Sequence, residues 1–146
     1  MRLREAMAAD AREIAEVFTA SRGLLTFLPK LHTAEEDRAF IATHVVPEYR
    51  VTLAEEGGRL LGYMAEGEAW IEQLYIRPEA VRRGIGSALL AAAKARQKRL
   101  ELWCFSQNLT GRAFYATQGF EALYETDGSG NQERASDIRY RWEAAR

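Results

Sequence analysis

The chain has 146 residues, the size of one ordinary domain, with 47% hydrophobic and 28% charged residues. This balance excludes a disordered chain, which lacks the apolar residues for a core, and a collagen-like fibre. The 20 basic and 21 acidic residues nearly cancel, whereas a nucleic-acid binder usually carries a basic excess that contacts phosphates. We therefore expect one globular domain, residues 1–146, with no nucleic-acid partner.

The sequence offers no metal cage and no membrane segment. Cys104 is the one cysteine, so it forms no internal disulfide, and His32 and His44 have no ligand cluster around them. Charged residues interrupt the first twenty positions, which excludes the apolar core of a signal peptide. The longest apolar run, Ala88–Ala93, is far below the ~20 residues of a membrane-spanning helix. We expect a cytoplasmic protein without a metal and without a membrane partner.

Capping signals predict where the helices begin and end. Asp10 followed by Glu13 is similar to a capping box, and Thr33 followed by Glu36 repeats that signature. The second of these helices is expected to end before Pro47, because the residue preceding a proline disfavours helical backbone. Apolar stripes predict two further helices, at residues 84–96 and 108–118. Gly119 directly follows the second helix and is typical of a helix end.

Runs of β-forming residues predict the strands, at residues 1–7, 50–55, 59–65, 70–76, 100–105, 120–125 and 138–142. Gly57 and Gly58 lie between the second and third of these runs and suit the positive φ angles of a hairpin turn. A polar, glycine-containing stretch, residues 126–137, separates the last two runs. Its role stays open between a mobile hairpin loop, a flap over the acceptor site and a dimer contact.

The segment from Leu74 to Ser87 carries the clearest chemistry. A predicted strand ends, a loop passes Arg82 and Arg83, and Gly84 and Gly86 open an amphipathic helix. The first amides of a helix lack intrahelical partners and point, with the positive end of the dipole, at whatever lies beyond them. Glycine permits close approach to the backbone, and arginine suits phosphate oxygens. The pattern predicts an anion site, although solvated surface arginines are the commoner case.

Two common nucleotide motifs do not fit this segment. The dinucleotide fingerprint needs a third glycine at position 89, where the chain has leucine, and a first glycine directly after the strand. Here the seven residues 77–83 intervene between Ile76 and Gly84. The Gly-Lys-Ser/Thr of a Walker loop is absent.

The run Arg82-Arg83-Gly84-Ile85-Gly86-Ser87, followed by Asn108 and by Phe114-Tyr115-Ala116-Thr117-Gln118-Gly119-Phe120, resembles the GNAT superfamily of acetyl-CoA-dependent N-acetyltransferases. The order of elements matches that family over essentially the whole chain. The resemblance implies a single domain of the α/β (α+β) class. Its mixed, mostly antiparallel sheet would be splayed between the fourth and fifth strands and flanked by about four helices.

The resemblance also implies which residues bind acetyl-CoA. The backbone of the fourth strand would pair with the pantetheine arm, and the loop amides would hold the pyrophosphate. Asn108 would touch the cofactor arm, although it also suits a helix cap. Either Arg82 or Arg83 would reach the 3′-phosphate, and Val81 replaces the Gln or Arg usual in the family. The implied cofactor-binding residues are Leu74, Tyr75, Ile76, Val81, Arg82, Arg83, Gly84, Ile85, Gly86, Ser87 and Asn108.

Two residues are candidates for catalysis. Tyr115 matches the family tyrosine near the thioester sulfur and would donate a proton to the leaving thiolate, although a core aromatic is its alternative role. Glu72 is the available carboxylate for freeing the amine lone pair, and the two-residue period of a strand places it on one face with Trp70, Leu74 and Ile76. Trp70 and Trp103 occupy the positions where relatives often have a glutamate base.

The expected function is acetyl transfer from acetyl-CoA to a primary amine by direct attack in a ternary complex. The alternative is a non-catalytic module that senses acyl-CoA. His32, just before the second helix, either contacts the acceptor or caps the helix. The acceptor stays open among small amines and peptides, since a family resemblance fixes the donor better than the acceptor. A homodimer is one possible assembly.

Overall fold

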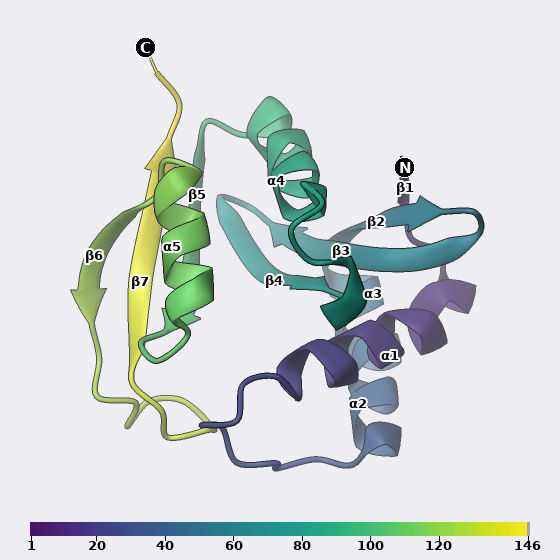
Figure 1. Cartoon of the computed structure of the whole chain (residues 1–146), viewed down its shortest axis with the longest axis horizontal. Helices are drawn as coiled ribbons and strands as arrows, with labels where there is room; N and C mark the ends of the chain where they lie inside the picture. The colour runs from purple at the N-terminus through teal and green to yellow at the C-terminus, as the bar shows by residue number, and fades with distance from the viewer. Residues whose placement is uncertain (146) are drawn as a thin grey trace.

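The computed structural model describes residues 1–145 and shows one mixed sheet of seven strands in the order β1-β2-β3-β4-β5-β7-β6 (Figure 1). The strands are β1 (Arg2–Glu5), β2 (Arg50–Glu56), β3 (Arg59–Gly67), β4 (Trp70–Ile76), β5 (Arg99–Phe105), β6 (Glu121–Glu125) and β7 (Asp137–Glu143). The main helices are α1 (Ala11–Arg22), α2 (Ala34–Phe40), α3 (Val46–Glu48), α4 (Ile85–Arg96) and α5 (Leu109–Thr117). Short 3₁₀ turns occur at η1 (Ala8–Asp10) and η3 (Pro78–Ala80), and a π-helical turn at η2 (Ile41–Val45).

The sheet opens between β4 and β5, as the GNAT resemblance implies. These two strands are parallel and pair at one position, Trp70 with Glu101, whereas the other neighbouring strands pair antiparallel over four or more positions. Beyond that pair, β4 and β5 diverge toward the end of β4 (Figure 1). The predicted fold class and the splay between the fourth and fifth strands are confirmed.

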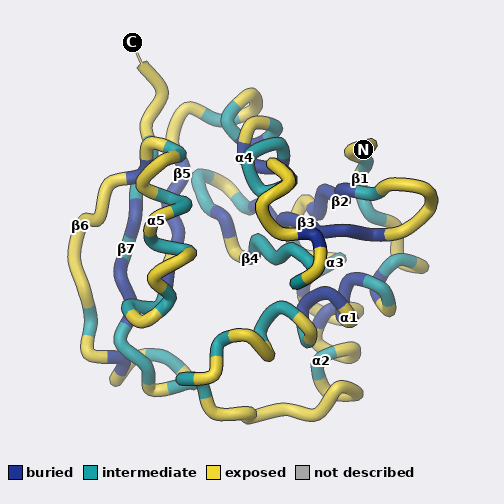
Figure 2. Tube along the Cα trace, in the orientation of Figure 1, coloured by how far each residue is buried: buried dark blue, intermediate teal, exposed yellow. Residues whose placement is uncertain are grey.

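Two apolar cores lie on opposite faces of the sheet (Figure 2). One core packs α4 against β3, β4, β5 and β7, with Leu89, Leu90 and Leu102 among its buried side chains. The other packs α1 and the π turn against β2 and β3, and includes Ile14 and Ile41. Aliphatic side chains of this kind contribute about 1.5–3 kcal/mol each when fully buried. The first core therefore spans the splay and joins both halves of the sheet, whereas the second covers the half that contains β2 and β3.

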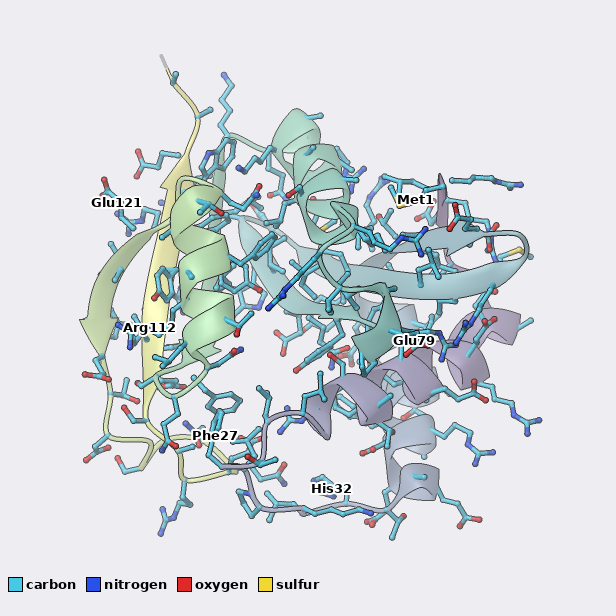
Figure 3. The ribbon with its side chains drawn as sticks, viewed as in Figure 1. Met1, Phe27, His32, Glu79, Arg112 and Glu121 are labelled. Atoms are coloured by element: carbon cyan, nitrogen blue, oxygen red, sulfur yellow. The ribbon has the colours of Figure 1, made fainter. Side chains whose placement is uncertain are left out.

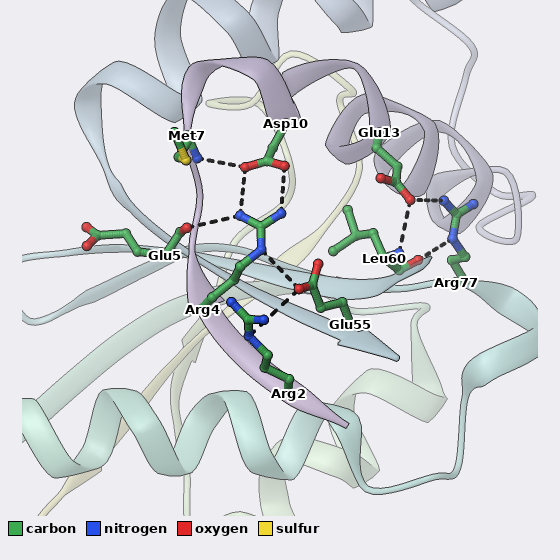
Figure 4. Close-up of polar contacts among 9 residues, drawn as sticks. All are labelled: Arg2, Arg4, Glu5, Met7, Asp10, Glu13, Glu55, Leu60 and Arg77. Atoms are coloured by element: carbon green, nitrogen blue, oxygen red, sulfur yellow. Dashed lines mark hydrogen bonds and ion pairs between the residues drawn. The ribbon is translucent and has the colours of Figure 1, made fainter. Parts of the chain in front are cut away.

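The predicted capping box at Asp10 and Glu13 is wrong. An extra 3₁₀ turn precedes α1, so the Asp10 carboxylate accepts the amide of Met7 at 2.8 Å and the Arg4 guanidinium at 2.8 and 3.0 Å (Figure 4). Glu13 instead accepts the amide of Leu60 at 3.0 Å. Both carboxylates therefore connect α1 to neighbouring elements rather than close its first turn.

The second predicted helix begins correctly but runs further than expected. Thr33 and Glu36 form a reciprocal capping box, with bonds of 2.9 and 3.1 Å. The helix does not end before Pro47, since α2 continues through the π turn into α3. In the π turn the amide of Val46 reaches back to the carbonyl of Ile41, and Pro47 is the second residue of α3.

The remaining turns follow the sequence signals. Gly57 and Gly58 have φ of 59° and 78° and join β2 to β3, and Gly119, at φ 86°, follows α5. These angles lie in the left-handed region, where a Cβ is strained. Within residues 1–145, no helix is long and apolar enough to cross a membrane.

Candidate active site

The loop between β4 and α4 presents backbone donors. Gly84 precedes α4 with φ 79°, and Arg82 has φ 67°. The amides of Gly84, Ile85, Gly86 and Ser87 meet no hydrogen-bond acceptor among the residues that the structure describes, and the first helical bond is from Ala88 to Gly84. Free amides at the positive end of a 12-residue helix form a site for an anion.

The three arginines near this loop have different partners. Arg77 turns inward, where its Nε donates to the carbonyl of Leu60 at 2.5 Å and its guanidinium lies 3.6 Å from Glu13 (Figure 4). Arg83 forms an ion pair with Glu56. Arg82 is exposed and forms no ion pair within residues 1–145. Of the two arginines that the sequence singles out, Arg82 is therefore the cation free to meet a phosphate.

Close packing between α4 and α5 explains the second glycine of the motif. A Cβ on Gly86 would lie 2.9 Å from Cζ of Phe114, so the two helices approach only because this position has no side chain. Ser87 also faces α5, and its hydroxyl is 2.9 Å from the Gln118 amide nitrogen that donates to it. Ile85 is buried in the core and Val81 is exposed. The motif thus contributes backbone amides, whereas most of its side chains serve packing.

The end of β4 has a free backbone edge. Leu74, Tyr75 and Ile76 pair with β3 on one side, and on the other side β4 has no pair with β5 beyond Trp70. Leu74 and Ile76 pack against the core beneath α4, and Tyr75 packs into the opposite core. An extended arm carrying amide groups fits such an edge in the manner of an added strand.

Tyr115, on α5, lies beside the space between β4 and β5. Its ring packs against Phe114, Phe120 and Tyr140 at centroid distances of 5.2, 5.7 and 6.1 Å. Burial raises the pKa of the phenol well above its ordinary value, with smaller contributions from Cys104 of β5 and Tyr75 of β4. The phenol therefore stays protonated at neutral pH, the state required of a proton donor.

Two further residues near the space between β4 and β5 have structural roles. Asn108 caps α5, since its Oδ1 accepts the amide of Gly111 at 3.0 Å, as one of its two sequence interpretations predicts. Cys104 is buried, and burial raises the pKa of its thiol to about 11. A thiol that stays protonated at neutral pH is a poor nucleophile, so nothing here favours an acyl-cysteine.

A cleft of about 860 Å³ opens on the face opposite α4. We call it the acceptor cleft, and its walls come from α1, the loop 23–32, α2, β4 and the loop 126–136. His32 lines it and lies 3.0 Å from Oε1 of Gln132 (Figure 3). His32 does not cap α2, because Thr33 does. Four carboxylates line the cleft: Glu36, Asp37, Glu72 and Glu133.

Glu72 opens into the acceptor cleft, but not on the predicted face. The register of β3 against β4 passes from Gln73 to Ile71, so Glu72 is the extra residue of a β-bulge. The bulge breaks the two-residue period, and Leu74 and Ile76 pack beneath α4 while Glu72 lines the cleft with Gln73 and Tyr75. The expected shared face with Leu74 and Ile76 is therefore wrong. Trp70 stays beside Glu72, and its Nε1 donates to the Glu72 carboxylate at 2.7 Å.

A family model for the acetyltransferase (GNAT) domain matches residues 47–122, just over half of the chain. The chain belongs to the GNAT acetyltransferase family. The predicted family is confirmed. The matched region contains β4, α4 and α5, so the free amides, the open edge of β4 and Tyr115 all lie within it.

Individual relatives agree with this GNAT assignment. Peptidyl-lysine N-acetyltransferase YiaC of Escherichia coli (strain K12) is 39% identical over 70 residues, and that match spans about half of each protein, 47% of this chain and 48% of the relative. A GCN5-related N-acetyltransferase from Rhodopseudomonas palustris has a similar structure, with a TM-score of 0.81 and 22% identity over 97% of this chain and 94% of its own. YncA of Salmonella typhimurium, solved with its cofactor acetyl-CoA, has a TM-score of 0.73 and 19% identity over 100% of this chain and 95% of its own. The two structural likenesses show the fold.

The sequence missed one part of this GNAT site. Arg22, at the end of α1, donates to Glu133 at 3.1 Å, and its guanidinium lies 5.4 Å from the Phe18 ring and 5.9 Å from the Phe105 ring. This contact joins α1 to the loop 126–136 across one wall of the acceptor cleft. No local pattern could reveal it, because the two partners are 111 residues apart.

Proposed function

We propose that this GNAT domain transfers the acetyl group of acetyl-CoA to a primary amine by direct attack within a ternary complex. The observation that carries the proposal is the placement of the free amides of Gly84–Ser87 next to the open edge of β4. The amides suit the pyrophosphate of coenzyme A, the edge suits the amide groups of its arm, and Arg82 suits a phosphate. The residues present therefore fit this cosubstrate, the one that YncA was solved with.

In this proposal the two substrates meet different parts of β4. The donor lies along the edge that faces β5, and the acceptor enters through the acceptor cleft, which Glu72, Gln73 and Tyr75 of β4 line. An amine of pKa up to about 10.4 is mostly protonated at neutral pH, so its lone pair must be freed before it attacks. We propose Glu72, which lines the cleft, as the group that takes that proton.

The transfer removes two protons from the nitrogen and returns one to the sulfur. Glu72 takes the first proton from the ammonium group and passes it to solvent. The amine nitrogen then forms a bond to the thioester carbon, the carbon–sulfur bond breaks, and the departing thiolate takes a proton from the Tyr115 phenol. The nitrogen gives up its second proton as the amide forms, and that proton restores the phenol. The raised pKa of Tyr115 keeps it in the donating form.

The acceptor we propose is a cationic primary amine, and the lysine side chain of a peptide is the first candidate. The carboxylates of Glu36, Asp37 and Glu72 line the cleft, and they favour a positively charged group. The relative named as a peptidyl-lysine N-acetyltransferase supports the same substrate class.

The test uses the purified full chain with acetyl-CoA and a panel of amines: a lysine peptide, the same peptide with an acetylated lysine, and spermidine. We expect thiol release only when a free amine is present, together with a mass increase of one acetyl group on the amine. Acetyl-CoA binding without acetylation of any amine would favour the acyl-CoA sensor instead.

A further inference from the structure

The indole of Trp70 contacts both the Glu72 carboxylate of the acceptor cleft and the arginine of a partly buried ion pair. Its Nε1 donates to the Glu72 carboxylate at 2.7 Å, and the Cζ of Arg139 lies 4.4 Å from the Trp70 ring. The same guanidinium lies 5.1 Å from the ring of Trp103. Arg139 is therefore flanked by two indoles, and one of them holds the carboxylate in the cleft. We call Trp70, Glu72, Glu101, Trp103 and Arg139 the Trp70 cluster.

Arg139 has a fixed position because Glu101 binds it. Glu101 is buried, accepts Nε of Arg139 at 2.8 Å and Nε of Arg141 at 3.2 Å. The bond from Arg139 lowers the pKa of the Glu101 carboxyl, so this group stays ionised. The cation over the indole face is attracted to the ring, which restrains the rotamer of Trp70.

The cluster lies at the one pair between β4 and β5, Trp70 with Glu101. The two strands separate from this point onward, so the cluster is where the two halves of the sheet are tied together. Trp103 is 39% exposed, so the contact between Arg139 and the two indoles leaves part of the apolar surface in solvent. The N–H of Trp70 is directed at a carboxylate of the cleft, which packing alone does not require.

We propose that Trp70 is a positioning residue that aims the Glu72 carboxylate at the acceptor amine, with Arg139 and Glu101 holding the indole in place. The inference rests on the proposed acetyl transfer. Glu72 is an exposed side chain in a bulge, and such a side chain samples several rotamers unless a bond restrains it. Tyr49, which precedes β2, also faces Glu72 and is a second neighbour of the carboxylate.

The first test is a double-mutant cycle on kcat/KM for the lysine peptide. Trp70→Phe keeps the aromatic ring and removes the N–H, and we expect kcat/KM to fall about tenfold, the effect of one hydrogen bond to a charged group. In the Glu72→Gln background the same change should cost nothing further, because its effect passes through Glu72. The KM for acetyl-CoA should not change. Trp142→Phe, at the tryptophan outside the cluster, which packs against the core beneath α4 and Lys94, is the matched control and should leave kcat/KM unaltered.

The second test observes the bond without turnover. The chain has 3 tryptophans, so an NMR spectrum of ¹⁵N-labelled protein shows three indole N–H signals. The signal that is missing from the spectrum of Trp70→Phe is that of Trp70. We expect Glu72→Gln to move the Trp70 signal, and the lysine peptide to move it in the wild type but not in Glu72→Gln.

The outcomes separate the inference from the proposed function. The positioning role would be overturned, while acetylation itself stands, by either of two results. One is a Trp70 indole N–H signal that does not move in Glu72→Gln. The other is a fall in kcat/KM from Trp70→Phe that persists in full in the Glu72→Gln background. Absence of acetylation by the wild type would overturn the proposed function.

Discussion

The proposed donor site and the acceptor cleft are built in opposite ways. The proposed donor site uses consecutive residues, the end of β4 and the loop into α4, and it presents backbone atoms. The acceptor cleft uses side chains from α1, two loops, α2 and β4. A backbone site depends on glycines and φ angles, so a short motif reveals it. A site built from distant side chains exists only once the chain has folded.

Tyr115 lies at the boundary between these two regions, and its replacement gives the largest effect that we expect. Tyr115→Phe removes the proton donor and keeps the ring contacts, so kcat should fall by about 10³-fold, within the range of general acid catalysis. Acetyl-CoA affinity should be unchanged by calorimetry. Tyr124→Phe, at an exposed tyrosine of β6, is the matched control and should keep full activity. Equal activity of the two variants would remove Tyr115 from the mechanism.

Glu72→Gln sharpens the comparison on the acceptor side. The change keeps the size of the side chain and removes the base, so kcat/KM for the amine should fall by about 10²-fold, with water as a poorer substitute. The rise of activity with pH should also change shape, because one titrating group is gone. Glu68→Gln, in the exposed turn before β4, is the control. An unchanged pH–rate profile in Glu72→Gln would show that Glu72 is not the base.

Gly84→Ala tests the backbone side of the comparison. Position 84 has φ 79° and open space for a Cβ, so steric contact plays no part and the cost is backbone strain. We expect the free energy of unfolding to drop by about 1–2 kcal/mol in urea titrations and acetyl-CoA affinity to weaken. Gly130→Ala, also in open space but without a positive φ, should not destabilise the protein. A Gly84→Ala protein of wild-type stability and affinity would contradict the backbone account.

Arg4→Met lies outside both regions and tests whether effects stay local. The bond from Arg4 is the main cause that lowers the pKa of the Asp10 carboxyl below its ordinary 3.8. The stabilisation is therefore present above the unfolded-state pKa and is lost as the pH falls through the lower folded-state pKa. Arg4→Met should reduce stability at pH 7 by about 1 kcal/mol or less and flatten its decline in acid. Activity per folded molecule should not change, which activity and urea titrations at several pH values would show.

The sequence predicted the features that depend on local pattern. The Gly57-Gly58 turn, the Thr33–Glu36 box and the splay implied by the GNAT resemblance are all present. The features that it missed depend on contacts that the capping and proline rules do not describe. The Asp10 carboxylate binds Arg4 instead of an amide of α1, and the helix before Pro47 continues through a π turn.

Within the candidate site, the residues of the motif were predicted and the contacts between separate elements were not. The loop residues from Arg82 to Ser87 lie together where the motif predicts an anion site, and Asn108 caps its helix. The bulge at Glu72 was not predictable from a two-residue period, because a bulge is defined by the register with the partner strand. The contacts of Trp70 with Glu72 and Arg139 depend on that register and on β7, which lies more than sixty positions later in the chain.

The central claim is that the free amides at the start of α4 and the open edge of β4 bind acetyl-CoA. Thermal unfolding of the full chain with acetyl-CoA, coenzyme A and NAD in parallel tests this most directly. A ligand at 100 times its Kd adds about 2.7 kcal/mol, which for a chain of this size raises the unfolding midpoint by roughly 5–10 °C. We predict such a shift with acetyl-CoA and coenzyme A and none with NAD. No shift at saturating acetyl-CoA would contradict the account.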